Sequence, residues 1–372
     1  MDIAFQSTVN YGGVGRFTVE LLSVLADKCD SVTLYPTPLS VDNPKQLDWW
    51  DDIPENLDVV PTPSTPEVFL SHCRKFSDHD LVHINYASFG SAALISSVLT
   101  DTPYVFTIHG SLDIDFQYRS LRERLKHELL ERHLFLPIVS RNGTSVSVSE
   151  YAGQRLQTEL GLETQTIYHG INAEKYESTI DFDREQYGIS ADSEIVLFVG
   201  RFYPSKGVFP LLKAFEIVCK QYNDDIDLVI VGGGEQSHDV ETRIAASNLD
   251  TIHLLQDLSD TELTALYNDA SVFALPSTSE TFGLVFLEAM ATSTPIVCAN
   301  AGAAPEVVGD AGLVSETTDP DEIAQNILDL LTDTALYSTI QSNAEQRITQ
   351  FSWEHAADQY IELYSDVIKR SS

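Results

Sequence analysis

The stretch PSTSETFGLVFLEAMATSTP, residues 276–295, lies between two short apolar runs and decides the fold. The runs on either side of it, residues 270–275 and 296–299, are typical of buried strands. Residues 284–291 are apolar on nearly every helical face, which predicts a buried helix that begins after Gly283. Strand, polar loop, helix and strand together indicate a parallel α/β unit, in which ligands bind at the carboxyl ends of strands.

Two carboxylates, Glu280 and Glu288, lie eight positions apart around this helix start. Unpaired N–H groups and the positive dipole end favour a phosphate there, and Gly283 permits a close backbone approach. Glu288 is a lone acid in an apolar helix, which predicts a partner or a ligand. Five helical residues span about 7–8 Å, so we expect Glu288 to bind a ribose and Glu280 to lie near a sugar. The alternative is a capping role for Glu280 and a buried lysine beside Glu288.

A cationic pair follows the predicted strand of residues 194–199, in the sequence GRFYPSKG. Arg201 and Lys206 occupy this strand-end loop in a chain where positive groups are scarce. A forked guanidinium and a compact ammonium suit a diphosphate leaving group. The alternative is that both are ordinary surface charges.

These motifs resemble the donor site of glycosyltransferase family 4, retaining enzymes of the GT-B fold. The E-x7-E pattern with TFG inside it and the G-R-x4-K-G pattern both match, and the likeness runs over nearly the whole chain. It implies an α/β fold of two Rossmann-like domains facing across a cleft. The expected domains are an acceptor-side domain of residues 1–172, a nucleotide-sugar domain of residues 173–351, and a terminal helix of residues 352–372 that crosses back to the first.

The same resemblance implies the chemistry. Arg201, Lys206 and the backbone amides of Phe282, Gly283 and Leu284 would bind the diphosphate of a nucleotide-sugar donor and stabilise its charge as it leaves. The sugar would pass to a hydroxyl acceptor by a front-face mechanism that retains its configuration, with no metal and no other cofactor. The Asp113-Ile114-Asp115 sequence mimics a metal motif of another glycosyltransferase fold and is interpreted as a loop.

A glycine-rich turn and a histidine mark the first domain. Gly12 and Gly13 lie between a predicted strand and a helix expected over residues 17–26, a pattern that also fits a tight turn or a dehydrogenase-like loop. The resemblance implies that they close over the donor. His109 ends a predicted strand, where α/β ligands bind, and the resemblance makes it a catalytic contact to the sugar. The alternative is a structural histidine.

The charge balance sets the class of partner. The chain has 372 residues, with 56 acidic against 22 basic residues and a net charge of −34 spread along its length. Such a surface stays hydrated in molar salt, so we expect a cytoplasmic protein of a halophile. Its charge excludes nucleic acid as a partner. Four widely spaced cysteines predict neither a disulfide nor a zinc site, and the start at Met1 shows no signal peptide.

The basic residues gather in a predicted helix over residues 119–136. One interpretation is a surface for a lipid-linked acceptor or for the inner face of the membrane. The other is a solvated helix with internal ion pairs, since acids lie among its bases.

Other functions are compatible with parts of the pattern. A nucleotide-sugar epimerase also uses two Rossmann domains, and a non-catalytic nucleotide-sugar or glycan binder would keep the same cleft. A nicotinamide dehydrogenase is disfavoured, because neither glycine loop has its fingerprint. The motifs do not name the nucleotide, the sugar or the acceptor.

Overall fold

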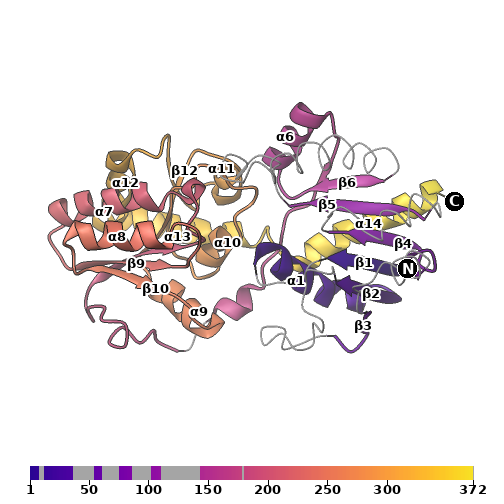
Figure 1. Cartoon of the computed structure of the whole chain (residues 1–372), viewed down its shortest axis with the longest axis horizontal. Coiled ribbons are helices and arrows are strands. Elements are labelled where there is room, and N and C mark those ends of the chain that lie inside the picture. Colours follow the sequence, from indigo (N-terminus) through magenta and orange to yellow (C-terminus); the bar gives the residue numbers. More distant parts are fainter. Residues whose placement is uncertain are drawn as a thin grey trace. The chain divides into compact units, whose positions relative to one another are not determined.

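The computed structural model describes residues 1–7, 12–36, 54–60, 75–85, 102–109, 143–177 and 180–371. The chain forms two compact units, whose elements are labelled in Figure 1. Unit 1 contains Met1–Gly170 and Ser352–Ser372, and unit 2 contains Ile171–Phe351. The chain therefore leaves unit 1 once and returns to it for its last helix.

Unit 1 is built on a parallel sheet in the order β3-β2-β1-β4-β5-β6-β7. Most residues of its longer strands are buried, as expected for a sheet covered on both faces, and Ile3, Ala4 and Phe5 of β1 are fully buried. The described strands are β1 (Asp2–Ser7), β2 (Ser31–Pro36), β3 (Leu57–Val59), β4 (Leu81–Ile84), β5 (Tyr104–Ile108), β6 (Thr144–Ser147) and β7 (Gln165–Thr166). The described helices are α1 (Gly13–Lys28), α6 (Glu150–Leu160) and α14 (Trp353–Ser371).

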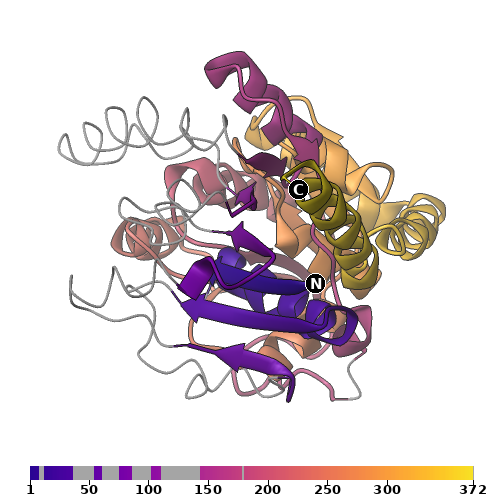
Figure 2. The same cartoon turned by 90° about the vertical axis from the view of Figure 1, so that its right-hand side faces the viewer.

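The terminal helix α14 belongs to the core of unit 1. Trp353, Tyr360 and Tyr364 are buried in one cluster with Phe17 of α1. Figure 2 shows α14 lying along the strands of this unit. The Tyr364 hydroxyl lies 2.5 Å from Nδ1 of the fully buried His83. Two Rossmann-like domains and the return of the last helix to the first are thereby confirmed.

Unit 2 has a parallel sheet in the order β10-β9-β8-β11-β12-β13. Its strands are β8 (Glu194–Val199), β9 (Ile226–Val231), β10 (Ile252–Leu255), β11 (Val272–Leu275), β12 (Ile296–Ala299) and β13 (Gly312–Ser315). Its helices are η4 (Ala173–Tyr176), η5 (Pro204–Lys206), α7 (Val208–Gln221), α8 (Ser237–Ser247), α9 (Asp260–Asp269), α10 (Leu284–Ala291), α11 (Ala304–Val308), α12 (Pro320–Thr332) and α13 (Thr334–Ile348). Helix α7 packs between α8 and α12, and α10 packs against α11 and α13.

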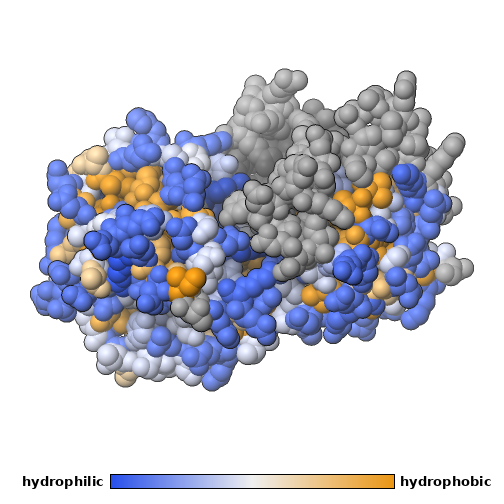
Figure 3. Space-filling model, turned by 90° about the horizontal axis from the view of Figure 1, so that it is seen from below, coloured by the Kyte–Doolittle hydropathy of each residue, from blue (hydrophilic) through white to orange (hydrophobic). Residues whose placement is uncertain are grey.

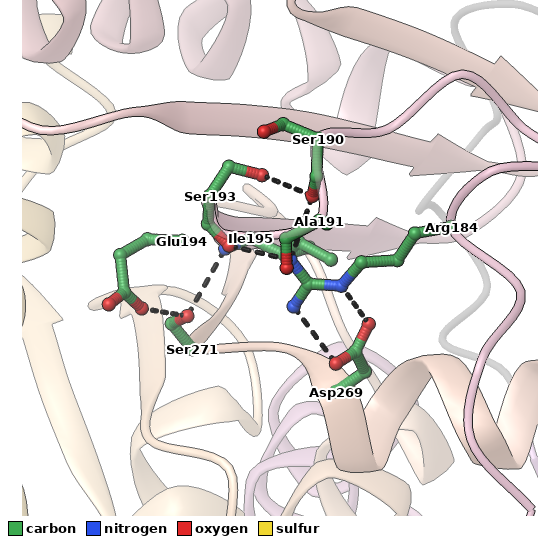
Figure 4. A network of polar contacts seen from close by, with 8 residues as sticks. All are labelled: Arg184, Ser190, Ala191, Ser193, Glu194, Ile195, Asp269 and Ser271. Carbon is green, nitrogen blue, oxygen red and sulfur yellow. Dashed lines mark hydrogen bonds and ion pairs between the residues drawn. The ribbon is translucent and has the colours of Figure 1, made fainter.

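One polar network ties the segment that enters unit 2 to its sheet (Figure 4). The Arg184 guanidinium bonds both carboxylate oxygens of Asp269, at 2.7 and 2.9 Å. Beside it, the Ser271 hydroxyl contacts the Glu194 carboxylate and accepts a bond from the amide of Ile195. Arg184 also donates to the carbonyl oxygens of Ser190, Ala191 and Ser193. The planar Arg184 guanidinium, bonded to a carboxylate and three carbonyl oxygens, fixes the segment that leads into β8.

The surface reflects the acidic composition. On the face shown in Figure 3, hydrophilic residues predominate among the described residues, with smaller hydrophobic areas between them. In the part of the chain that the structure describes, no helix combines the length and the apolar character that crossing a bilayer requires.

Candidate functional site

The sheet of unit 2 changes its winding direction between β8 and β11. Strand β8 pairs with β9 on one side and with β11 on the other, so the chain winds outward both ways from β8. Ligands of α/β sheets bind beyond the carboxyl ends of the strands at such a switch point. Residues 200–207 follow β8 and residues 276–283 follow β11. The two loops that carry the predicted donor-binding motifs therefore lie side by side here.

Backbone contacts join these two loops. The carbonyl oxygen of Ser205 accepts a bond from the N–H of Thr278 at 2.8 Å and one from the Ser277 hydroxyl at 2.9 Å. Gly207 has a φ of +73°, and a Cβ there would lie 2.1 Å from the carbonyl oxygen of Pro276. Any side chain at this position would both strain the backbone and push the loops apart. The spacing between the loops is therefore fixed by main-chain geometry.

Lys206 and Glu280 form an ion pair across the two loops. Nζ of Lys206 lies 2.6 Å from Oε1 of Glu280, and their side chains are 22% and 8% exposed. Water screens such a pair less than a surface pair. The loop after β12 holds the Glu280 backbone, since Ala303 donates to its carbonyl oxygen at 2.8 Å and a Cβ on Gly302 would meet it at 2.5 Å. Two predicted site residues that are far apart in sequence are thus brought together.

The start of α10 lies in the same loop. Its N-cap residue is Gly283, with a φ of +90°, and a Cβ at that position would lie 2.6 Å from the ring of Phe286. As a glycine, this N-cap residue has no side chain that could cap the helix, and the first turn, from Leu284, contains no acid. Phe282 is buried and anchors the loop beside these amides. The helix start has the features of an anion site, and Glu280 does not act as its cap.

Glu288 is buried in the same helix and is held by a tyrosine. The Tyr267 hydroxyl donates a 2.8 Å hydrogen bond to Oε2 of Glu288, whose residue is 4% exposed. Tyr267 is fully buried in α9, and its carbonyl oxygen accepts a bond from the Thr294 hydroxyl. One partner of this buried acid is therefore a neutral phenol. A carboxylate held in this way suits hydroxyl groups as ligands.

Arg201 lies on the same loop as Lys206 but makes a different contact. Its residue is exposed, and its guanidinium carbon lies 5.0 Å from the ring centroid of Tyr203. This distance is within the range of a cation–π interaction. Among the described residues, no hydrogen bond joins Arg201 to Lys206 or Glu280. The structure therefore brings Lys206 together with Glu280 and leaves Arg201 exposed on the same loop.

The glycine turn after β9 rests on the loop after β8. Phe202 donates from its N–H to the carbonyl oxygen of Gly233 at 2.9 Å. A Cβ on Gly232, where φ is +141°, would lie only 2.0 Å from the carbonyl oxygen of Gly200. A glycine is therefore required at position 232. The strand-end loops of unit 2 form one connected layer at the carboxyl edge of its sheet.

The three predicted site residues of unit 1 lie at the carboxyl edge of that unit's own sheet. Helix α1 begins at Gly13, one turn earlier than predicted, because Gly12 makes the turn with a φ of +138°. His109 follows β5, and its Nε2 contacts Oδ1 of Asn85. Burial lowers the pKa of His109 to about 3, so its ring is neutral near neutral pH.

Sequence reasoning missed residues that carry no motif. Tyr267 is one of several apolar positions in α9, and Asn85 is one polar residue at the end of β4. His169 belongs to no predicted site motif, yet the centroid of its ring lies 5.3 Å from that of His109. Only the folded arrangement identifies these residues as neighbours of the predicted ones.

Some predictions fall outside the described residues. These are the basic helix of residues 119–136 and the Asp113-Ile114-Asp115 loop. Over the ranges that the structure does describe, no cluster of three or more His, Cys, Asp or Glu side chains could hold a metal ion.

Both halves of the chain match glycosyltransferase family models. Residues 11–175 match the model described as Glycosyltransferase Family 4, and residues 179–347 match Glycosyl transferases group 1. An uncharacterized glycosyltransferase of Methanocaldococcus jannaschii is 28% identical over 291 residues, which covers 77% of this chain and 76% of that protein. A D-inositol 3-phosphate glycosyltransferase of Corynebacterium urealyticum is 28% identical over 307 residues, covering 77% of this chain and 71% of the relative.

Solved structures show the same fold. HepE of Anabaena, in complex with UDP-glucose, superimposes with a TM-score of 0.80 at 22% identity, covering 98% of this chain and 100% of that chain. A glycosyltransferase of Rickettsia africae superimposes with a TM-score of 0.77 at 19% identity, covering 99% and 98%. Since its fold is GT-B and the two family models match both of its units, the chain belongs to the glycosyltransferases of family 4 and group 1.

Proposed function

We propose that this glycosyltransferase moves a sugar from a nucleoside-diphosphate sugar to a hydroxyl acceptor, with retention of configuration and without a metal ion. The observation that carries the proposal is the Lys206–Glu280 pair at the switch point of unit 2, beside the start of α10 at Gly283. A cation and a row of amides favour a diphosphate at this place. The adjoining carboxylates favour the hydroxyl groups of a sugar and a ribose.

The diphosphate would be held from two directions. Lys206 would contribute its ammonium group, and the amides of Phe282, Gly283 and Leu284 would contribute N–H donors. Arg201 is on the same loop and is exposed, so it would supply a second positive charge as the ligand enters. Donors that are fixed before the reaction stabilise the charge that develops on the leaving phosphate, which is often the largest single catalytic contribution.

The two carboxylates would divide the rest of the donor. Glu288 lies further along α10 than the phosphate-binding amides, and we assign it to the ribose hydroxyls. Glu280 precedes the helix, and we assign it to the hydroxyls of the transferred sugar. Lys206 would hold Glu280 in this orientation through the pair that they form.

Retention is supported by the partners of these acids. Glu280 is bound by Lys206 and Glu288 by Tyr267, so neither has the exposed carboxylate of a covalent nucleophile. In the front-face reaction, the acceptor oxygen bonds to the anomeric carbon as the bond to the phosphate oxygen breaks. The proton of the acceptor hydroxyl passes to the departing phosphate. The bound diphosphate is then both leaving group and base.

Unit 1 would contribute Gly12, Gly13 and His109. Gly12 and Gly13 give α1 a start without a side-chain cap among the described residues, which suits an approach by phosphate or sugar oxygens. His109, neutral at physiological pH, would bind a hydroxyl rather than a phosphate. A lipid-linked acceptor, contact with the inner face of the membrane and a cytoplasmic location remain proposals that rest on sequence alone.

A donor screen tests the proposal. Thermal unfolding in molar KCl would be measured with a panel of nucleoside-diphosphate sugars, beginning with UDP-glucose because HepE was solved with it. We expect one donor to raise the melting temperature and to be consumed in EDTA. Its product or slow hydrolysis product should keep the anomeric configuration of the donor by NMR. Conversion of the donor to an epimer, inversion of configuration, or loss of activity in EDTA would each contradict the proposal.

A further inference from the structure

Asn85 connects a hydroxyl pair to His109 at the carboxyl edge of the unit 1 sheet. Its Nδ2 lies 2.8 Å from Oγ of Ser7 and 3.0 Å from Oγ1 of Thr18. Its Oδ1 contacts Nε2 of His109. Ser7, Thr18 and Asn85 are all buried, with exposures of 0%, 0% and 2%. Buried polar groups of this kind must be paired, so each hydrogen can be assigned.

The hydroxyl pair fixes the orientation of the Asn85 amide. Thr18 donates its only hydroxyl hydrogen to the carbonyl oxygen of Val14 at 2.8 Å. The 2.5 Å contact between Ser7 and Thr18 must then be made by the hydrogen of Ser7. Neither hydroxyl has a hydrogen left for Asn85. The amide must therefore present its NH2 group to both hydroxyls and its oxygen to the histidine, because a flipped amide would set oxygen against oxygen.

The orientation of Asn85 in turn fixes the tautomer of His109. An amide oxygen only accepts, so the nitrogen that faces it, Nε2, must carry a hydrogen. A neutral imidazole has one N–H group, which leaves Nδ1 as an acceptor with a lone pair. Among the described residues this buried nitrogen has no hydrogen-bond partner. Nδ1 is therefore an acceptor whose direction is set by the ring, and no described residue donates a hydrogen bond to it.

The surroundings of His109 keep the ring neutral. Burial lowers its pKa to about 3. Within the described ranges, the titratable groups that face it are two other histidines, His169 at 5.3 Å between ring centroids and His83. Burial lowers the pKa values of both as well. Phe17 packs against its ring at 4.5 Å. None of these neighbours offers a negative charge that would stabilise an imidazolium.

We propose that Asn85 is a positioning residue that holds His109 as the Nε2–H tautomer, so that Nδ1 accepts a hydrogen bond from a hydroxyl of the sugar substrate. The substrate part rests on the proposed function, whereas the tautomer rests on the contacts of Thr18 with Val14 and of Asn85 with Ser7, Thr18 and His109. His109 then acts as an acceptor throughout the reaction and supplies no proton. An acceptor at a fixed position selects a substrate with a hydroxyl there over one without it, since the mismatch leaves a buried lone pair unpaired.

The tautomer can be measured without substrate. In two-bond ¹H–¹⁵N spectra of histidine-labelled protein, assigned with His109→Gln, we expect a protonated Nε2 and a pyridine-like Nδ1 at His109. The signals should not titrate between about pH 5 and pH 8. A protonated Nδ1, or a titration in that range, would overturn the assignment whatever the activity of the protein.

A matched set of variants tests the role of Asn85. Asn85→Asp keeps the shape but places a carboxylate on Nε2, which should raise the pKa of His109 and make it titrate in the same spectra. It should also lower kcat/KM about tenfold or more and add an ionisation to the pH profile. Asn343→Asp, the same change at a half-buried asparagine of unit 2 that donates to the Asp310 carbonyl, is the control and should have neither effect. Asn85→Asp with wild-type pH behaviour would refute the positioning role.

A second pair of variants tests the acceptor atom. Asn at position 109 can place an amide oxygen near the place of Nδ1, whereas Gln reaches toward the place of Nε2. We expect the kcat/KM of His109→Asn to be about fivefold or more higher than that of His109→Gln. The reverse order, in a protein that still binds and transfers a donor sugar, would remove Nδ1 as the substrate contact. Absence of binding and transfer in the wild-type protein would instead contradict the proposed function and leave the measured tautomer as it is.

Discussion

The hydroxyl of Tyr267 in α9 donates a 2.8 Å hydrogen bond to Oε2 of Glu288 in α10, and both residues are buried. This contact gives a buried acid a neutral partner. A hydrogen bond from a phenol fixes the direction of this carboxylate within the helix. Both side chains lie in unit 2, so the consequences can be tested by donor binding.

Replacing Glu288 should weaken donor binding more than it slows transfer. Glu288→Ala removes the proposed ribose contact, and we expect the dissociation constant of the nucleotide sugar to rise about tenfold or more. Titration calorimetry with the donor found in the screen measures the change. Glu345→Ala, at an acid on α13 in the same unit, serves as the control. An unchanged dissociation constant for Glu288→Ala would reject the ribose role.

Removing only the Tyr267 hydroxyl should have a smaller effect in the same direction. Tyr267→Phe keeps the buried ring and deletes the donor to Glu288, so we expect a rise in the dissociation constant of about three- to tenfold. In a double-mutant cycle with Glu288→Ala, the two effects should fall short of additivity, because Tyr267 acts through Glu288. Fully additive effects would show that Tyr267 influences the donor by another route.

Loss of the Lys206 cation should affect the reaction far more than the fold. Lys206→Met removes the charge at 2.6 Å from Glu280 and the proposed partner of the leaving phosphate. We expect kcat/KM to fall about a hundredfold or more, with a folded protein by circular dichroism. Lys28→Met breaks an ion pair with Asp358 in unit 1 and should leave turnover within about twofold. Near-normal turnover in Lys206→Met would remove it from the leaving-group site.

The buried histidines should make the protein sensitive to acid. Burial lowers the pKa values of His83, His109 and His169 below 6.5, so below about pH 6.5 the unfolded state binds more protons than the folded state. Above the pKa of the unfolded state these histidines do not lower the free energy of unfolding. Below it, the free energy of unfolding falls with pH by on the order of 1 kcal/mol per pH unit for each histidine.

Carboxylates titrate in the same range, so the measurement is a comparison of variants. Between about pH 7 and pH 5, the free energy of unfolding of His109→Gln should fall less steeply than that of the wild type. The exposed-site control His355→Gln should follow the wild-type slope. Equal slopes for His109→Gln and the wild type would show that His109 is charged in the folded protein.

Salt should stabilise the fold. A net charge of −34 repels itself, and raising KCl from about 0.1 M to about 2 M shortens the screening length to a few ångströms. We expect the melting temperature to rise by several degrees over this range, as a halophilic origin would require. A melting temperature that does not respond to KCl would contradict that expectation.

The sequence by itself determined the elements and the chemical class of the site. The predicted helix of residues 284–291 coincides with α10, and the strands of residues 194–199 and 296–299 coincide with β8 and β12. These predictions succeed because an apolar run between polar loops has few ways to bury itself. The eight-residue spacing of Glu280 and Glu288 is likewise a local property, since it follows from one loop and one helix.

Only the tertiary structure decided which side chains meet. Lys206 and Glu280 are 74 positions apart, and they pair because β8 and β11 are neighbours at the switch point of the sheet. The contacts of Tyr267 with Glu288, and of Asn85 with His109, likewise join separate elements. No local pattern encodes such contacts, because a side chain's partner is set by strand order and helix packing, which depend on the burial of the whole chain.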